Sequence, residues 1–167
     1  MIGAIWLGLG AVAAAGPLRE PVMTLLNSHE EPIDAGSVKA LGRGAAAELL
    51  EISQDPAVPP TRRARAITAL SHVDMTTEIR NALTTHLRSS EPLLQRHAAR
   101  SLVPLGDAAI DDLNLALASD DVQLRIAAAE ALGRIGTTRS ARALRNRLAR
   151  ETHPLAKDAL TTALEAR

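Results

Sequence analysis

The sequence contains no cysteine, phenylalanine or tyrosine, and Trp6 is its only aromatic residue. The lack of cysteine excludes disulfide bonds, zinc sites with thiolate ligands and thiol catalysis. The lack of aromatic side chains disfavours a β-sandwich and suits helices that pack through small side chains. Proteins often hold single-stranded nucleic acid by stacking bases on aromatic rings, and this chain has almost nothing to offer for that purpose.

Neither sign of charge is in excess, because 19 lysines and arginines balance 19 aspartates and glutamates. A neutral chain is not drawn as a whole to nucleic acid or to an anionic membrane. The charges are unevenly placed, since residues 1–60 carry a net charge of −4 and residues 121–167 carry +4. This polarity either arises by chance among solvated faces or allows copies to pair head to tail. We therefore expect a monomer or a weak head-to-tail self-association.

Alanine and leucine are abundant, and they recur at a regular period. Leu70, Leu102, Leu132 and Leu164 follow one another at intervals of 32, 30 and 32 residues, and similar residue types recur around each of them. Seven positions before these leucines stand Arg63, Gln95, Arg125 and Lys157. A period near 30 that holds two short helices is typical of a repeat array. Small residues on the packing faces allow such units to stack in one direction.

The clearest unit begins with an expected helix over residues 122–135. Leu124, Ala128 and Leu132 lie four residues apart and therefore share one helix face. A second apolar face predicts that neighbours sandwich this helix. We expect its few polar residues, Arg125 among them, to face water.

The ends of the helices in this unit also have sequence signals. Asp120 and Asp121 suit the N-terminal cap of helix 122–135, because a short carboxylate accepts hydrogen bonds from free N–H groups. Gly136 suits a left-handed C-terminal cap, and Thr137 or Thr138 can cap the helix that follows. In the preceding unit, Pro104 should kink its helix or end it early.

The pattern Arg-x-x-Ala-Ala-x-Ala-Leu-x-x-Ile-Gly, from Arg125 to Gly136, resembles the short bacterial HEAT repeat of the phycobilisome-lyase type. The resemblance extends over residues 60–167 and is weak over residues 17–59. It implies an all-α fold, an α-solenoid of about four antiparallel helix pairs, which usually works as a binding scaffold. A minority of relatives are bilin lyases or DNA glycosylases, and no residues that carry those activities are found in this chain.

The chain divides into three segments, residues 1–16, 17–55 and 56–167. Residues 17–55 are expected to form a degenerate N-terminal helical repeat, interrupted by Gly42 and Gly44. Residues 56–167 form the regular array, which begins at a proline-rich break. The expected helices of the array are 61–73, 75–87, 92–105, 108–118, 122–135, 140–149 and 154–166.

Residues 1–16 contain no charged side chain. They are interpreted as a cleaved signal peptide, as a membrane anchor or as a buried first helix. Small residues near position 13 favour the signal peptide, whereas no lysine or arginine precedes the apolar run. The signal peptide would send the protein to the periplasm or the cell exterior, and the alternatives leave it membrane-anchored or cytoplasmic.

No arrangement of residues predicts catalysis or a bound cofactor. The five histidines, residues 29, 72, 86, 97 and 153, lack the spacing of a helical zinc site. The pairs 111–112 and 120–121 are explained by helix starts, where negative charge is favourable. We therefore assign no catalytic, metal or cofactor-binding residue and expect a protein that is not an enzyme.

The most suggestive cluster is basic, and it consists of Arg139, Arg142, Arg145, Arg147 and Arg150 on one short helix. Arginine binds carboxylate and phosphate groups through two hydrogen bonds at once. These arginines are interpreted as a solvated face or as salt bridges to a partner, and alternatively as a nucleic-acid interface.

The sequence thus predicts a non-catalytic scaffold for protein partners, with nucleic-acid binding or a bilin-lyase-like role as alternatives. By analogy with similar arrays, the second helix of each pair should line the concave side. The expected partner-binding residues are Arg80, Thr84, Asp112, Asn114, Arg142 and Arg145.

Overall fold

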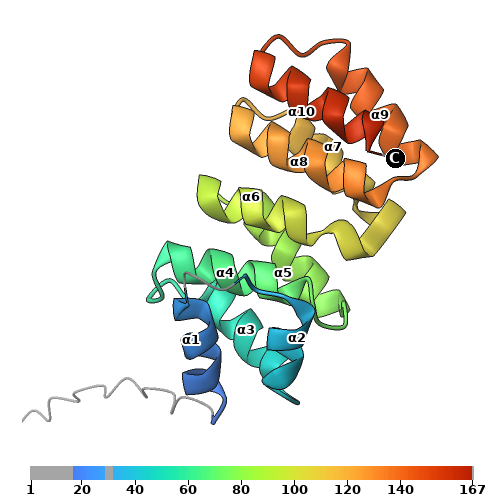
Figure 1. The fold of residues 1–167 in the computed structure, drawn as a ribbon. Coiled ribbons are helices and arrows are strands. Elements are labelled where there is room, and N and C mark those ends of the chain that lie inside the picture. The colour runs from blue at the N-terminus through green and yellow to red at the C-terminus, as the bar shows by residue number, and fades with distance from the viewer. Residues whose placement is uncertain (1–16, 29–31, 167) are drawn as a thin grey trace, which may run out of the picture.

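A computed structural model describes residues 17–28 and 32–166, and within these ranges the regular structure is helical throughout (Figure 1). The elements are α1 (Arg19–Asn27), α2 (Ala35–Ala40), α3 (Ala45–Gln54), α4 (Pro60–Leu70), α5 (Thr77–Leu87), α6 (Pro92–Ser101), the 3-10 helix η1 (Val103–Ala109), α7 (Ile110–Leu117), α8 (Val122–Ile135), α9 (Thr138–Leu148) and α10 (Pro154–Glu165). The predicted all-α solenoid is confirmed. The expected signal peptide or anchor over residues 1–16 lies outside the described residues.

The predicted caps around α8 and α9 are present. The Asp121 side chain accepts a hydrogen bond of 2.8 Å from the backbone N–H of Gln123, which satisfies a free donor in the first turn of α8. Gly136 ends α8 with φ 69°, in the left-handed region where glycine carries no steric penalty. Thr137 then caps α9 by accepting from the N–H of Ser140 at 3.2 Å.

Pro104 shortens its helix as predicted. A single helix was expected over residues 92–105, but α6 ends at Ser101 and η1 replaces its last turn. Proline donates no backbone hydrogen bond, and its ring clashes with the carbonyl four residues earlier, so the α-helix cannot continue through it. Gly106, at φ 55°, then redirects the chain toward α7.

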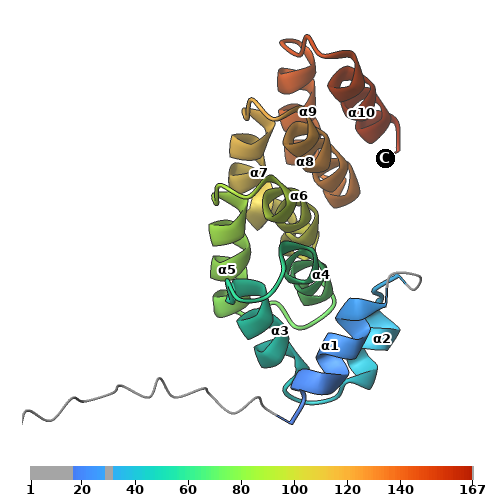
Figure 2. The ribbon, with the colours of Figure 1, turned by 90° about the vertical axis from the view of Figure 1, so that its left-hand side faces the viewer.

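The helices stack as two rows, and the stack is curved so that one row lies on its inner, concave side and the other on its outer, convex side (Figure 2). The inner row contains the first helices of the units, α4, α6, α8 and α10, and successive members pack closely. The outer row contains the second helices, α5, α7 and α9, which contact one another much less. The expectation that the second helices line a concave side is therefore wrong.

Small residues explain the close packing of the inner row. Ala98 in α6 and Ala128 in α8 are fully buried. Gly133 in α8 lies so close to α10 that an added Cβ would stand 2.9 Å from the Cβ of Ala163. Helices that approach this closely on one side of the stack must spread on the other, and the whole array bends.

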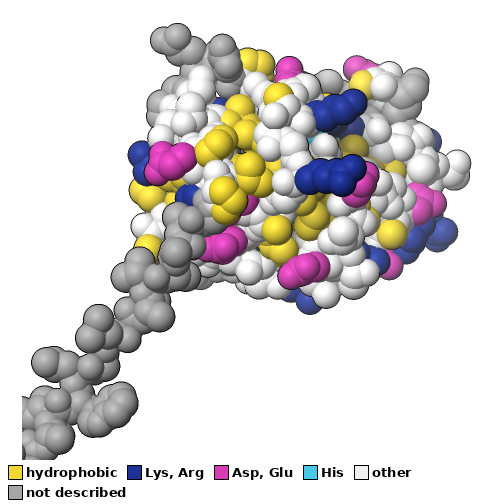
Figure 3. Space-filling model, turned by 90° about the horizontal axis from the view of Figure 1, so that it is seen from below, with side chains coloured by type: hydrophobic (Ala, Val, Ile, Leu, Met, Phe, Trp, Pro, Cys, Tyr) yellow, Lys and Arg dark blue, Asp and Glu magenta, His cyan; other side chains and the backbone are white. Residues whose placement is uncertain are grey.

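The periodic leucines form the core of the stack. Leu70, Leu102 and Leu132 are completely buried, whereas Leu164 in the last helix is half-buried. At the N-terminal end, hydrophobic side chains reach the surface among charged ones (Figure 3). Within the described residues, none of the helices has both the length and the apolar character needed to cross a membrane.

Candidate functional site: a basic groove between α7 and α9

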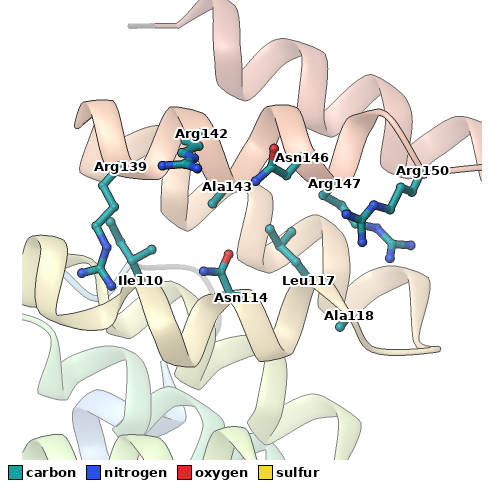
Figure 4. Close-up of a pocket in the computed structure, with 10 residues that line it drawn as sticks. All are labelled: Ile110, Asn114, Leu117, Ala118, Arg139, Arg142, Ala143, Asn146, Arg147 and Arg150. Carbon is teal, nitrogen blue, oxygen red and sulfur yellow. The ribbon is translucent and has the colours of Figure 1, made fainter.

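A groove of about 510 Å³ runs between two neighbouring helices of the outer row, and we call it the α7–α9 groove (Figure 4). It is lined by Ile110, Asn114, Leu117, Ala118, Arg139, Arg142, Ala143, Asn146, Arg147 and Arg150. Arg139 stands at one end and Arg150 at the other, and Asn114 and Asn146 lie between them (Figure 4). The groove exists because the outer row is spread, which leaves space between helices that occupy equivalent places in successive units.

The helical period of α9 decides which of its side chains line the groove. Ser140, Ala141 and Leu144 are buried against the stack, with relative exposures of 0%, 1% and 0%. Residues 139, 142 and 146 share one face of α9, and Arg150, which was expected on the same helix, lies in the turn after α9 ends at Leu148. All four are exposed along the groove.

The α7 wall supplies the apolar floor. Ile110 and Leu117 are almost fully buried, while Asn114 and Ala118 are exposed beside them. A ligand in the groove would therefore meet hydrocarbon below and polar groups along the rim.

The arginines of the groove fall into two classes. Arg139 is neutralised by Asp111, with Nη2 to Oδ1 at 2.7 Å, and it also donates to the Asp107 carbonyl. Arg147 is paired with Glu151 at 2.8 Å, a carboxylate that it shares with Arg125. The side chains of Arg142 and Arg150 are exposed and form no hydrogen bond or ion pair within the described residues. None of the ten lining residues is acidic, so these two guanidinium groups keep an uncompensated positive charge.

Glu151, beside the groove, is the centre of a buried ionic cluster. Its Oε2 accepts from Arg125 Nε at 2.8 Å and from Arg147, and its Oε1 accepts from Arg125 Nη2 at 2.9 Å and from the N–H groups of Thr152 and His153. The bonds from Arg125 are the largest cause that holds the pKa of Glu151 far below its ordinary value. Burial opposes this effect, while His153 N–H and Arg147 reinforce it.

Arg125 corrects one prediction. It was expected to face water, yet its side chain is 8% exposed and that of Glu151 is 0% exposed. Arg125 Nη1 also donates to the carbonyls of Ser119 and Asp120, each at 3.0 Å. We call this arrangement the Arg125 clasp, because it joins the loop before α8 to the loop before α10.

The equivalent positions in earlier units make similar contacts. Arg63 donates to the Ser53 carbonyl at 3.2 Å and pairs with Glu91 at 3.1 Å. Gln95 donates to the Ser89 carbonyl at 2.6 Å. At three of the four positions, the long polar side chain seven residues before the leucine thus has a structural role: Arg63 binds a carbonyl at the end of the preceding helix, and Gln95 and Arg125 bind carbonyls of the preceding loop.

The structure brings together two of the six residues expected to bind a partner. Asn114 and Arg142 face each other across the α7–α9 groove. Arg145 is exposed on α9 but outside the groove lining, and Asp112 on α7 is bound to Arg88 at 2.9 Å. Arg80 and Thr84 lie on α5, away from the groove lining.

Asn146, Ile110 and Leu117 were missed as lining residues. The helical period alone could have grouped Asn146 with Arg139, Arg142 and Arg150. The α7 residues needed knowledge of how far α7 stands from α9, and no sequence signal gives that distance.

Two of the histidines bind to neighbouring helices. His86 is buried and lies 3.3 Å from the hydroxyl of Ser53, and His97 lies 2.8 Å from the hydroxyl of Thr68. Burial is the main cause that lowers both pKa values, and nearby arginines add to it. Across the described residues, no group of three or more histidine, aspartate or glutamate side chains is placed to hold a metal ion.

A larger groove of about 740 Å³ lies between α8 and α10. Its charged residues are of both signs, Glu130, Arg134 and Asp158, and its other walls are mostly small side chains. Nothing in this mixture favours one kind of ligand, so the α7–α9 groove is the better candidate site.

Comparisons with known proteins place the chain among helical repeats. A family model described as HEAT repeats matches residues 81–165. Among solved structures, the chain is similar to human deoxyhypusine hydroxylase in complex with glycerol, with a TM-score of 0.60 and 27% sequence identity. The match covers 81% of this chain and 44% of that one, so the chain spans less than half the length of that protein. The search of curated proteins found no significant match.

Proposed function

The chain belongs to the HEAT-repeat family, and from this premise we propose that it is a non-catalytic scaffold that binds a protein partner through the second helices of its array. We also propose that its repeats are of the short phycobilisome-lyase type. The period of 30 to 32 residues and the pattern from Arg125 to Gly136 support that assignment.

One observation carries the proposal. The α7–α9 groove keeps Arg142 and Arg150 exposed and unpaired within the described residues, beside an apolar floor. Interfaces are enriched in arginine, and a few residues, arginine often among them, carry most of the binding energy. Arg139 and Arg147 on the same helix are already engaged by carboxylates of the chain itself, so two of the four groove arginines are left for a partner.

The hydroxylation of deoxyhypusine, which the name of the solved neighbour states for that protein, is not proposed for this chain. The chain spans 44% of the hydroxylase, and His86 and His97 are engaged by Ser53 and Thr68 between helices. Histidines that bridge neighbouring helices in this way stabilise packing, and His86 is also buried, which leaves it poorly placed to meet a substrate.

The test is a crosslinking pull-down from the native host with the full chain as bait. The variant Arg142→Glu with Arg145→Glu reverses two exposed charges on α9, and Lys39→Glu with Arg43→Glu makes the same charge change on exposed residues near α2. We expect the α9 variant to lose partners that the α2 variant and the unmodified chain retain. If all three baits capture the same proteins, this surface does not bind the partner.

A further inference from the structure

We infer that the α7–α9 groove binds a carboxylate-rich extended segment of the partner, with acidic side chains on Arg142 and Arg150 and an apolar side chain between them. This inference rests on the scaffold function proposed above and specifies the chemistry of the partner.

The spacing of the two free arginines sets the spacing of the acids. Arg142 lies in α9, and Arg150 lies eight residues later, in the turn just after α9 ends at Leu148. Ala149 keeps right-handed helical dihedral angles, and the Arg150 N–H donates to the Arg147 carbonyl, so the chain continues to coil as far as Arg150. With a rise of about 1.5 Å per residue within the helix and about 2 Å in the tighter turn, the backbone positions of the two arginines are roughly 12 to 13 Å apart. An extended segment rises about 3.3 Å per residue, so acids four residues apart are separated by about 13 Å. Residues i, i+2 and i+4 of such a segment point to the same side, which predicts the pattern acid-x-apolar-x-acid.

The middle of the groove suits the other parts of that pattern. Leu117 and Ala143 line it with hydrocarbon, which an apolar side chain at the central position would cover. Asn114 and Asn146 lie between the terminal arginines (Figure 4). Each amide side chain can both donate and accept hydrogen bonds, as the backbone of an extended segment requires.

The charges around the groove favour separate carboxylates over a continuous phosphate backbone. Asp111, whose side chain is 81% exposed, stands against Arg139 at one end of the groove and would repel a chain of phosphates. Tight nucleic-acid binding usually combines about six to ten phosphate contacts, whereas two groove arginines are unengaged within the described residues. The lining also contains no aromatic side chain on which a base could stack.

The experiment titrates the full chain with a fluorescently labelled synthetic peptide whose core is Glu-Ala-Leu-Ala-Glu, read by fluorescence anisotropy at low salt. A matched peptide has the core Gln-Ala-Leu-Ala-Gln, and a single-stranded DNA oligonucleotide serves as the phosphate probe. The variant Arg142→Gln with Arg150→Gln removes the two anchors. Lys39→Gln with Arg43→Gln removes the same charge from the surface near α2.

We expect the acidic peptide to bind saturably and the glutamine peptide to bind at least about tenfold more weakly, a difference of about 1.4 kcal/mol. The groove variant should lose about tenfold or more in affinity for the acidic peptide, and the control variant should stay within about twofold. Rising salt should weaken the binding, because exposed charges are screened.

Two results with the peptides would overturn the inference: no saturable binding of the acidic peptide up to about 1 mM, or equal binding of the acidic and glutamine peptides. Two further results would also overturn it: equal losses of affinity for the acidic peptide in the groove and control variants, or tighter binding of the oligonucleotide than of the acidic peptide, abolished in the groove variant. The pull-down separates this failure from failure of the scaffold. If Arg142→Glu with Arg145→Glu loses a partner while the acidic peptide does not bind, the scaffold stands and the ligand class is wrong.

Discussion

The Arg125 clasp should contribute more to stability than any exposed ion pair of the array. The substitution Arg125→Met keeps a long apolar stem but removes two charge-assisted hydrogen bonds to Glu151 and two to the carbonyls of Ser119 and Asp120. It leaves the Glu151 carboxylate, 0% exposed, with Arg147 and two backbone N–H groups as its remaining donors.

The loss of stability in Arg125→Met depends on the groups that lose a hydrogen-bond partner, the Glu151 carboxylate and two carbonyls. Removing one partner of a buried ion pair typically costs 3 to 5 kcal/mol. Because Glu151 keeps other donors, and because the two freed carbonyls can bind water, we expect a loss at the lower end, about 3 kcal/mol. For a chain of this length that corresponds to a fall of about 6 to 12 °C in Tm. Arg100→Met is the matched control, because the Arg100–Glu130 pair is 40% and 45% exposed and should be worth at most about 1 kcal/mol.

Urea unfolding followed by far-ultraviolet circular dichroism measures both variants. A double-mutant cycle with Glu151→Gln isolates the pair: the double variant should lose about 2 kcal/mol less than the sum of the single variants. Repeat arrays can unfold in parts, so the urea dependence of the free energy must be the same in all variants for the comparison to hold. If Arg125→Met is no more harmful than Arg100→Met, the clasp is not a stabilising element.

Three further predictions concern pH and packing. Because the pKa of Glu151 is lowered in the folded chain, its ionised carboxylate contributes fully to folding stability above pH 4.5, its ordinary pKa, and this contribution is lost as the pH falls further, since the unfolded chain then binds the proton first. The stability difference between the unmodified chain and Glu151→Gln should therefore shrink in acid, and an unchanged difference would contradict this. Burial lowers the pKa of His86, so the chain should lose stability as the pH falls below 6.5, and His86→Gln should show a smaller loss; equal losses would rule out this histidine as the cause. Gly133→Ala should lower the free energy of unfolding by about 1 to 2 kcal/mol, because the overlap of the new methyl group with Ala163 at 2.9 Å outweighs the gain of about 1 kcal/mol in helix propensity. Adding Ala163→Gly should restore part of that stability, and a Gly133→Ala chain that is more stable than the unmodified one would show that α8 and α10 can separate freely.

Local signals in the sequence predicted much of the array. The caps at Asp121, Gly136 and Thr137 and the early end of α6 before Pro104 depend on chain neighbours, and all four are confirmed. The period of the leucines likewise predicted the stacking. These features need only the helical repeat and the chemistry of helix ends.

The orientation of Arg125 could not be predicted in this way. A helical wheel shows a charged residue at the edge of an apolar face, and water is then the default environment. Its true partner, Glu151, is 26 residues away and belongs to the loop of the next unit. The recurrence of Arg63 and Gln95 at the same register was visible in the sequence, but the backbone carbonyls that they bind, those of Ser53 and Ser89, have no sequence signature.

The α7–α9 groove in the outer row exists because the helices of the inner row pack closely. Alanine and glycine in α6, α8 and α10 draw the inner row together, and the outer row spreads as a result. Spreading opens the α7–α9 groove and exposes one face of α9, whose arginines would otherwise meet a neighbouring helix. Arg147 connects the α7–α9 groove with the buried ionic cluster, since it lines the groove and also binds Glu151. Substitutions that loosen the inner row, such as Gly133→Ala, should therefore change groove binding even though Gly133 is not among the groove residues, whereas Arg142→Gln should change binding without changing stability.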